Sequence, residues 1–141
     1  MNADVIKKID ELIEEYEPRV IEDTVRFVNI KSTKEEPLPG APFGLGPRKV
    51  LDEFLNIADK DGFYTKDLGV GFVTASMYEG EADLGIWVHG DVVEAGDGWK
   101  FPPYDATVYS GCIIGRGATD NKGQLSAILN LFRIFKDNDI K

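Results

Sequence analysis

The short run from Leu84 to His89, Leu-Gly-Ile-Trp-Val-His, constrains the fold more than any other stretch of this sequence. It is almost continuously apolar, and strands that are apolar on both faces are typical of the buried centre of a sheet. Segments with apolar residues three and four positions apart flank this run, and such spacing predicts amphipathic helices. The sequence therefore predicts an α/β fold in which helices pack on a mixed β-sheet.

Three helices are expected from the spacing of apolar residues. The first has its stripe from Val5 to Tyr16, and Pro18 is expected to interrupt it before a second stripe restarts the helix. The next begins near Pro47, because proline suits the first helical position, and ends at Asp61-Gly62. The third covers residues 122–136, where large apolar side chains again share one face.

Short strands and one long loop are expected between these helices. Residues 63–66 and 70–77 have the composition of strands, and Ser110-Gly111 is expected to turn a hairpin within residues 107–114. Residues 31–47 contain four prolines and three glycines, which predicts a loop inside the domain and no boundary between domains.

Charge and cysteine content exclude several classes of protein. The 141 residues carry 16 Lys and Arg against 25 Asp and Glu, a net charge of −9, with no basic run. Nucleic acid and anionic membranes are therefore excluded as expected partners. A single cysteine, Cys112, excludes an internal disulfide framework. No apolar stretch approaches the length of a membrane span or has the pattern of a secretion signal, so we expect a cytoplasmic protein.

His89 and Asp91 follow the apolar run and are separated by one residue. A side-chain period of two places both on one face of a strand end. A metal-binding imidazole is usually oriented by a carboxylate or carbonyl on its other ring nitrogen, and this pair could supply both groups. The alternative is that the only histidine of the chain merely ends a strand, and the spacing alone leaves both interpretations open.

A second polar cluster, residues 115–123, lies between a predicted strand and the last helix. Its glycines permit sharp turns and a close approach of the backbone to a ligand or metal. Asp120 directly precedes the helix, where its carboxylate could bridge two cations or could serve as an ordinary helix N-cap.

Several other enzyme classes do not fit these residues. A phosphate-binding P-loop requires lysine after its second glycine, whereas Lys122 precedes Gly123, and Asp120 stands where a dinucleotide fingerprint has a small residue. No serine lies in a Gly-x-Ser-x-Gly turn, and Cys112 in a strand is more typical of a small buried residue than of a nucleophile.

The motifs are more specific together than apart. They occur in the order His89-Gly-Asp-Val-Val93, Gly96-Asp-Gly-Trp99, Pro102-Pro-Tyr104 and Gly115-Arg-Gly-Ala-Thr-Asp-Asn-Lys-Gly123. This order resembles the N-terminal half of the catalytic domain of the M20 zinc peptidases, most closely the bacterial dipeptidases of the PepV and carnosinase-like kind. Residues 46–51 and 60–63 resemble the same subgroup. The resemblance covers nearly the whole chain, and its sharp motifs lie within residues 87–123.

The resemblance implies an enzyme that hydrolyses dipeptides with two zinc ions. His89 would ligate one zinc ion, Asp91 would be the catalytic-site residue that holds its imidazole, and Asp120 would bridge both metals. The Asp120-Asn121 peptide bond would be cis. The sequence departs from the family at Glu94, which replaces a usual proline, and at Asn121, where many members have a second aspartate.

The same resemblance implies structural roles for Trp99, for the 102–104 turn and for Arg116, and it implies missing parts. The family's further metal ligands and its general base come from later in the chain, whereas the 21 residues after Asp120 contain no Glu or His. Residues 1–141 are thus expected to be the N-terminal part of one catalytic domain, inactive without the remainder of that domain. Two alternatives stay open: an M20-type N-acyl-amino-acid amidohydrolase, and a standalone non-catalytic interaction domain.

Overall fold

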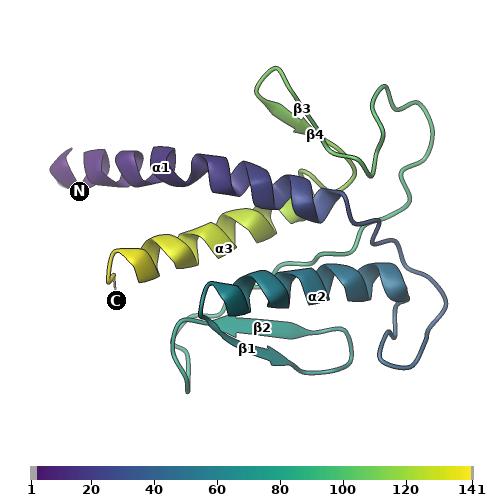
Figure 1. Ribbon diagram of the computed structural model, residues 1–141, viewed down its shortest axis with the longest axis horizontal. Coiled ribbons are helices and arrows are strands. Elements are labelled where there is room, and N and C mark those ends of the chain that lie inside the picture. The colour runs from purple at the N-terminus through teal and green to yellow at the C-terminus, as the bar shows by residue number, and fades with distance from the viewer. Residues whose placement is uncertain (1–2, 141) are drawn as a thin grey trace.

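The computed structural model describes residues 3–140 and contains three helices and two β-hairpins (Figure 1). The elements in chain order are α1 (Ala3–Val28), α2 (Leu45–Lys60), β1 (Tyr64–Asp67), β2 (Val73–Ser76), β3 (Thr107–Tyr109), β4 (Cys112–Ile114) and α3 (Lys122–Asp137). Helix α3 lies beside α1, and α2 lies on the other side of α3 in this view (Figure 1). The predicted α/β class is confirmed.

Helix α1 runs through Pro18 without a break, so the predicted interruption is wrong. Proline in a helix interior removes one backbone hydrogen bond and costs about 3 kcal/mol. Packing on both sides of Pro18 offsets this cost, because Leu12 and Tyr16 before it and Phe27 after it are buried. Burial of residues on both sides of the proline therefore outweighs one local helix breaker.

The hydrophobic core lies where the three helices and the first hairpin meet. Its buried members come from all three helices and from the connection between α2 and β1: Phe27, Val50, Ile57, Ala58, Phe63, Leu125 and Leu129. The rings of Phe63 and Phe132 meet edge to face with centroids 5.9 Å apart. The core thus confirms the predicted apolar faces of α2 and α3. In the stripe predicted for α1 only Leu12 and Tyr16 are buried, and Val5, Ile6, Ile9 and Ile13 are exposed.

Both hairpins are antiparallel and match the predicted strands closely. In the first, Tyr64 pairs with Ser76 and Asp67 with Val73. In the second, Thr107 pairs with Ile114, and the chain turns at Ser110-Gly111 with positive φ angles of 52° and 77°. Asparagine, glycine and a few polar residues tolerate such angles, and they suit a two-residue hairpin turn. The predicted hairpin turn is confirmed.

The central strand predicted at Leu84–His89 does not form among residues 3–140. This segment has no ladder partner, and Leu84 and Trp87 are 76% and 81% exposed. The two hairpins form separate sheets, and one isolated parallel bridge joins Thr33 to Val92. A strand needs neighbours for its backbone hydrogen bonds, so an apolar sequence alone does not create a sheet.

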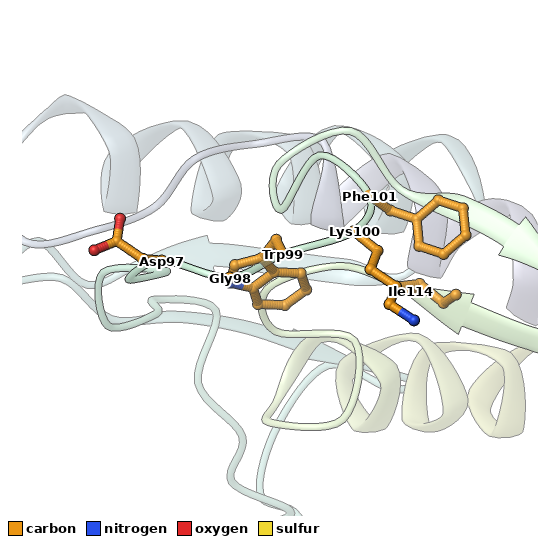
Figure 2. Close-up of a pocket in the computed structure, with 6 residues that line it drawn as sticks. All are labelled: Asp97, Gly98, Trp99, Lys100, Phe101 and Ile114. Carbon is orange, nitrogen blue, oxygen red and sulfur yellow. The ribbon is translucent and has the colours of Figure 1, made fainter.

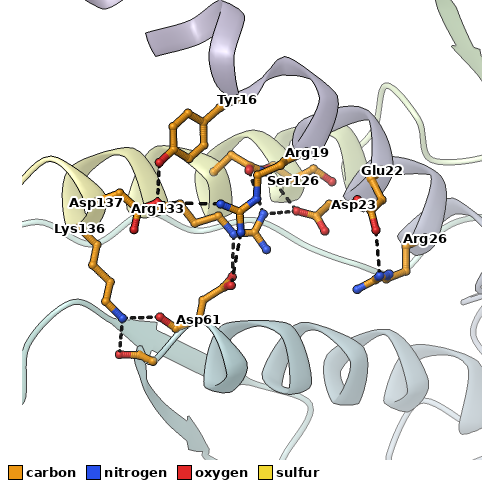
Figure 3. Close-up of polar contacts among 12 residues, drawn as sticks. Tyr16, Arg19, Glu22, Asp23, Arg26, Asp61, Ser126, Arg133, Lys136 and Asp137 are labelled. Atoms are coloured by element: carbon orange, nitrogen blue, oxygen red, sulfur yellow. Dashed lines mark hydrogen bonds and ion pairs between the residues drawn. The ribbon is translucent and has the colours of Figure 1, made fainter.

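A network of charged and polar side chains ties the three helices together (Figure 3). Arg133 of α3 donates to Asp23 of α1 and, over 2.6 Å, to Asp61 at the end of α2. Asn130 donates to the same Asp23 carboxylate over 3.1 Å. Asp23, Asn130 and Arg133 are buried, so these bonds lie between the helices and fix how the helices pack.

No helix within residues 3–140 is both long enough and apolar enough to cross a membrane.

Candidate metal centre

The structure brings together His89 and Asp120, which are 31 positions apart in the sequence. The imidazole Nε2 of His89 lies 3.1 Å from the Asp120 carboxylate oxygen Oδ1. His89 ends the exposed apolar segment, and Asp120 lies just before α3. Both side chains are open to solvent, His89 by 50% and Asp120 by 82%. The two predicted metal ligands therefore share one exposed location.

Asp91 lies on the opposite side of the same imidazole. The ring nitrogen Nδ1 of His89 is 3.3 Å from the Asp91 carboxylate and 3.1 Å from the Asp91 backbone carbonyl. Both groups can accept a hydrogen bond from a protonated Nδ1, as the Asp120 carboxylate can from a protonated Nε2, so acceptors on both sides orient the ring. Asp91 and Asp120, the other two predicted site residues, thus lie on opposite sides of the His89 ring.

This arrangement fits a cation between His89 and Asp120. When Nδ1 donates to Asp91, a neutral ring turns its Nε2 lone pair toward the Asp120 carboxylate, and two facing lone pairs require a proton or a metal ion between them. Two ligands about 2.0–2.1 Å from a tetrahedral zinc ion lie about 3.3 Å apart. The observed separation of 3.1 Å is close to that value. Nitrogen and carboxylate oxygen are also suitable donors for zinc.

The centre supplies only part of a coordination sphere. Within the part of the chain that the structure describes, no group of three or more His, Cys, Asp or Glu residues could hold a metal ion. A catalytic zinc ion generally takes three protein ligands and a water. The adjacent glutamates Glu14-Glu15 and Glu35-Glu36 are exposed on α1 and in the 31–47 loop, as their positions in the sequence predicted.

The loop before α3 positions Asp120 through its own backbone. Arg116 N–H donates to the Pro103 carbonyl over 2.6 Å, and Lys122 N–H donates to the Gly117 carbonyl over 2.9 Å. The Asp120-Asn121 peptide bond is cis, as the resemblance implied. Asn121 occupies the N-cap position of α3 without a side-chain capping bond, so the alternative role of Asp120 as the helix N-cap is not realised.

The loop of residues 95–104 lies beside this region and is held by its own polar contacts. The indole N–H of Trp99 and the Arg116 guanidinium both donate to the Ala95 carbonyl over 3.0 Å, and Arg116 also lies 5.3 Å from the centre of the Trp99 ring. Tyr104 accepts a bond from the Ala95 N–H. These contacts support the structural roles expected for these residues.

Trp99 also lines an open surface depression of about 360 Å³ (Figure 2). The other lining residues are Asp97, Gly98, Lys100, Phe101 and Ile114. The polar partners of His89 are Asp91 and Asp120, and neither of these residues lines the depression.

Sequence reasoning missed two residues that hold the centre. Ser32 is fully buried, and its hydroxyl donates to the Gly90 carbonyl over 2.7 Å, while its own carbonyl accepts from Val92 N–H over 3.0 Å. Lys122 is fully buried as well, although the sequence predicted only that it begins the last helix. No spacing signal points to Ser32, because its partners are 58 and 60 positions away; a lysine inside a glycine-rich motif was a signal for Lys122.

Comparison with known proteins supports the resemblance. Residues 85–141 match the model of Peptidase family M20/M25/M40. Two curated relatives, each named "Putative dipeptidase", come from Staphylococcus aureus (strain USA300) and Staphylococcus haemolyticus (strain JCSC1435). Both are 37% identical, over 92% and 90% of this chain respectively. The chain spans 28% of the length of each of these relatives.

A solved structure shares the fold. The crystal structure of human carnosine dipeptidase 1 superposes with a TM-score of 0.74 over 96% of this chain and 32% of the human chain, at 23% sequence identity. At that identity the likeness concerns the fold alone. The chain therefore resembles putative dipeptidases in sequence and carnosine dipeptidase 1 in fold, and its residues 85–141 match the M20 family that the ordered motifs predicted.

Proposed function

We propose that this chain forms the N-terminal part of the catalytic domain of a zinc-dependent dipeptidase. The single observation that carries the proposal is the imidazole of His89, which faces the Asp120 carboxylate through Nε2 and the Asp91 carboxylate through Nδ1. The dipeptidase relatives at 37% identity support a dipeptide as the substrate.

Each of the three residues has a distinct role in this proposal. His89 and Asp120 hold metal, and Asp91 keeps the ring in the tautomer that leaves Nε2 free to bind. A zinc ion supplies Lewis-acid polarisation of the peptide carbonyl and lowers the pKa of a bound water. The further ligands, the second zinc ion's site and the general base belong to the remainder of the protein, so the 141 residues alone hydrolyse no dipeptide.

The exposed apolar segment Leu84–His89 also supports the proposal that these residues form only part of a catalytic domain. Leu84, Ile86 and Trp87 are exposed although their sequence is typical of a buried strand. The chain spans only 28% of its dipeptidase relatives, so strands from the remaining residues are available to cover this segment in a whole protein. The remainder of its own catalytic domain is thus the principal partner of this chain.

The test uses the whole protein encoded by the gene that contains these residues. We expect zinc in the purified wild type and turnover of dipeptides, with loss of both in His89→Ala. Asp91→Ala should keep more zinc and lose rate, because removing a partner that orients a ligand costs about 10–100-fold in affinity or activity. Asp97→Asn, an exposed acid of the neighbouring loop, is the matched control and should leave both unchanged.

Full zinc content and full activity in His89→Ala would overturn the assignment of the centre. A gene that encodes these 141 residues alone, and a purified product that is monomeric and metal-free, would favour the alternative of a non-catalytic interaction domain. The same exposed residues, Leu84 and Trp87, would then form its binding surface. Light scattering and zinc analysis of that product distinguish the two functions.

A further inference from the structure

Lys122 is an unusual residue for the interior of a protein. It is fully buried at the first turn of α3, and its ammonium Nζ donates to the backbone carbonyl of Ile30 over 2.6 Å. Burying an unpaired charge costs free energy, so buried lysines normally have a compensating partner. Burial lowers the pKa of Lys122 to about 8, and the Asp91 carboxylate opposes that shift. The Ile30 carbonyl is thus the group that compensates the burial of this ammonium.

The glycines of the motif make room for this lysine. A Cβ on Gly117 would lie 3.0 Å from Lys122 Cδ and 2.7 Å from Val92 Cγ1, and Gly117 has a φ of +94°. A Cβ on Gly123 would lie 2.3 Å from the Ala118 carbonyl oxygen. The loop that carries Asp120 is therefore folded tightly around the aliphatic stem of Lys122.

From its buried position Lys122 connects the two halves of the centre. Its backbone begins α3 directly after the Asp120 loop, and its side chain reaches Ile30. Two residues further, Ser32 bonds to the Gly90 carbonyl and to Val92 N–H. These bonds fix the backbone on both sides of Asp91, next to His89. One continuous set of contacts thus runs from Asp120 to His89.

We propose that Lys122 is a positioning residue that sets the placement of Asp120 against His89 by fastening the 115–121 loop to the 30–33 segment. The proposal rests on the proposed function where it concerns zinc, whereas the geometry of His89 and Asp120 exists without metal. Its first consequence is that removing the ammonium separates Asp120 from His89 in the metal-free chain. Its second is a weaker hold on zinc.

The metal-free test uses the fact that His89 is the only histidine of the chain. Its imidazole gives one set of nitrogen and carbon NMR signals, and Asp120→Ala supplies the reference for a ring without its carboxylate neighbour. At one fixed pH, we expect Lys122→Met to move these signals toward those of Asp120→Ala. Methionine keeps the length of the aliphatic stem and lacks the charge. Wild-type imidazole signals in Lys122→Met would overturn the proposal.

A matched control separates positioning from simple loss of stability. Leu129→Ala removes a buried side chain of the same helix away from the centre and should lower thermal stability without moving the His89 signals. If Lys122→Met does not fold, Ser32→Ala is the second test of the proposal. It removes the hydrogen bond from the Ser32 hydroxyl to the Gly90 carbonyl, which is the next contact between Lys122 and His89. Unchanged His89 signals in a folded Ser32→Ala would contradict the proposal.

Zinc titration of the same variants provides the second readout. We expect Lys122→Met to bind zinc about tenfold more weakly than wild type, in the range for lost partners of metal ligands, and Leu129→Ala to bind as wild type does. Equal affinities for Lys122→Met and Leu129→Ala would overturn the proposal. If His89→Ala binds zinc as wild type does, the proposed function fails, and the metal-free NMR comparison still decides the role of Lys122.

Discussion

The helical body and the site segment of this chain differ in whether their backbone hydrogen bonds find partners within these residues. The helical body, α1, α2 and α3, buries a core and a charged network among its own residues (Figure 3). The site segment, residues 84–121, contains one short hairpin and leaves several large apolar side chains exposed. A helix makes its backbone hydrogen bonds internally, whereas a strand makes them with neighbours. The helical body therefore makes its backbone hydrogen bonds and its core within these residues, although Val5, Ile6, Ile9 and Ile13 of α1 stay exposed. Residues 84–89 of the site segment have no strand partner among residues 3–140.

The largest predicted effect tests whether the buried charged network stabilises the helical body, and it concerns Arg133. Arg133→Met should lower the free energy of unfolding by about 3–5 kcal/mol, because it leaves Asp23 buried without its cation. Urea denaturation of the chain measures the loss. Arg19→Ala is the control, since Arg19 is half exposed and its ion pairs with Asp61 and Asp137 span 3.6 and 3.9 Å. It should change stability by about 1 kcal/mol or less; equal losses would contradict the role of the buried network.

A second prediction sharpens the comparison with one large apolar residue from each region. Leu129→Ala in the helical body should cost about 2–5 kcal/mol, since a buried side chain leaves a cavity. Trp87→Ser in the site segment should change the stability of this chain by about 0.5 kcal/mol or less, because the indole is already in water. The same urea experiment measures both. A large loss from Trp87→Ser would show that the segment is packed within these residues.

The sequence predicts the helical body better than it predicts the site segment. Apolar spacing located α2 and α3, and the Ser110-Gly111 pair located the hairpin turn, because these features depend on residues close together in the chain. Leu84–His89 was predicted as a buried strand because its composition reflects burial, and composition carries no information on where the covering residues lie.

In the candidate centre, too, the sequence predicted residues that lie in local motifs and missed residues whose contacts are distant in the chain. His89, Asp91 and Asp120 were predicted from ordered motifs, and the structure places them together. The buried positions of Ser32 and Lys122 depend on contacts with residues about 60 and 90 positions away, which no local pattern encodes. The effect of Pro18 was overestimated for the opposite reason, since burial of Leu12 and Tyr16 before it and of Phe27 after it outweighed one local cost.

The smallest predicted effect concerns pH and the helical body. Burial, together with the hydrogen bond to Asp137, raises the pKa of Tyr16 from 10.0 to about 12. The unfolded chain therefore loses the phenolic proton first as pH rises. The stability contributed by Tyr16 is fully present below pH 10 and is lost between pH 10 and 12, by about 1 kcal/mol at pH 11.

Comparison with Tyr16→Phe isolates this contribution from the other groups that titrate in the same range. The difference in unfolding free energy between wild type and variant should shrink between pH 9 and pH 11, and urea denaturation at the two pH values measures it. A difference that is the same at both would show that the phenol is not held as a buried donor to Asp137.

The most direct test of the central claim is a zinc titration of the 141-residue chain in a double-mutant cycle of His89→Ala and Asp120→Ala. If both side chains hold one ion, each single variant weakens zinc binding, and the double variant binds no more weakly than the weaker single variant, because either change already breaks the shared site. Asp97→Asn, as control, binds as wild type does. Losses that simply add in the double variant, or wild-type affinity in either single variant, would contradict a shared metal centre at His89 and Asp120.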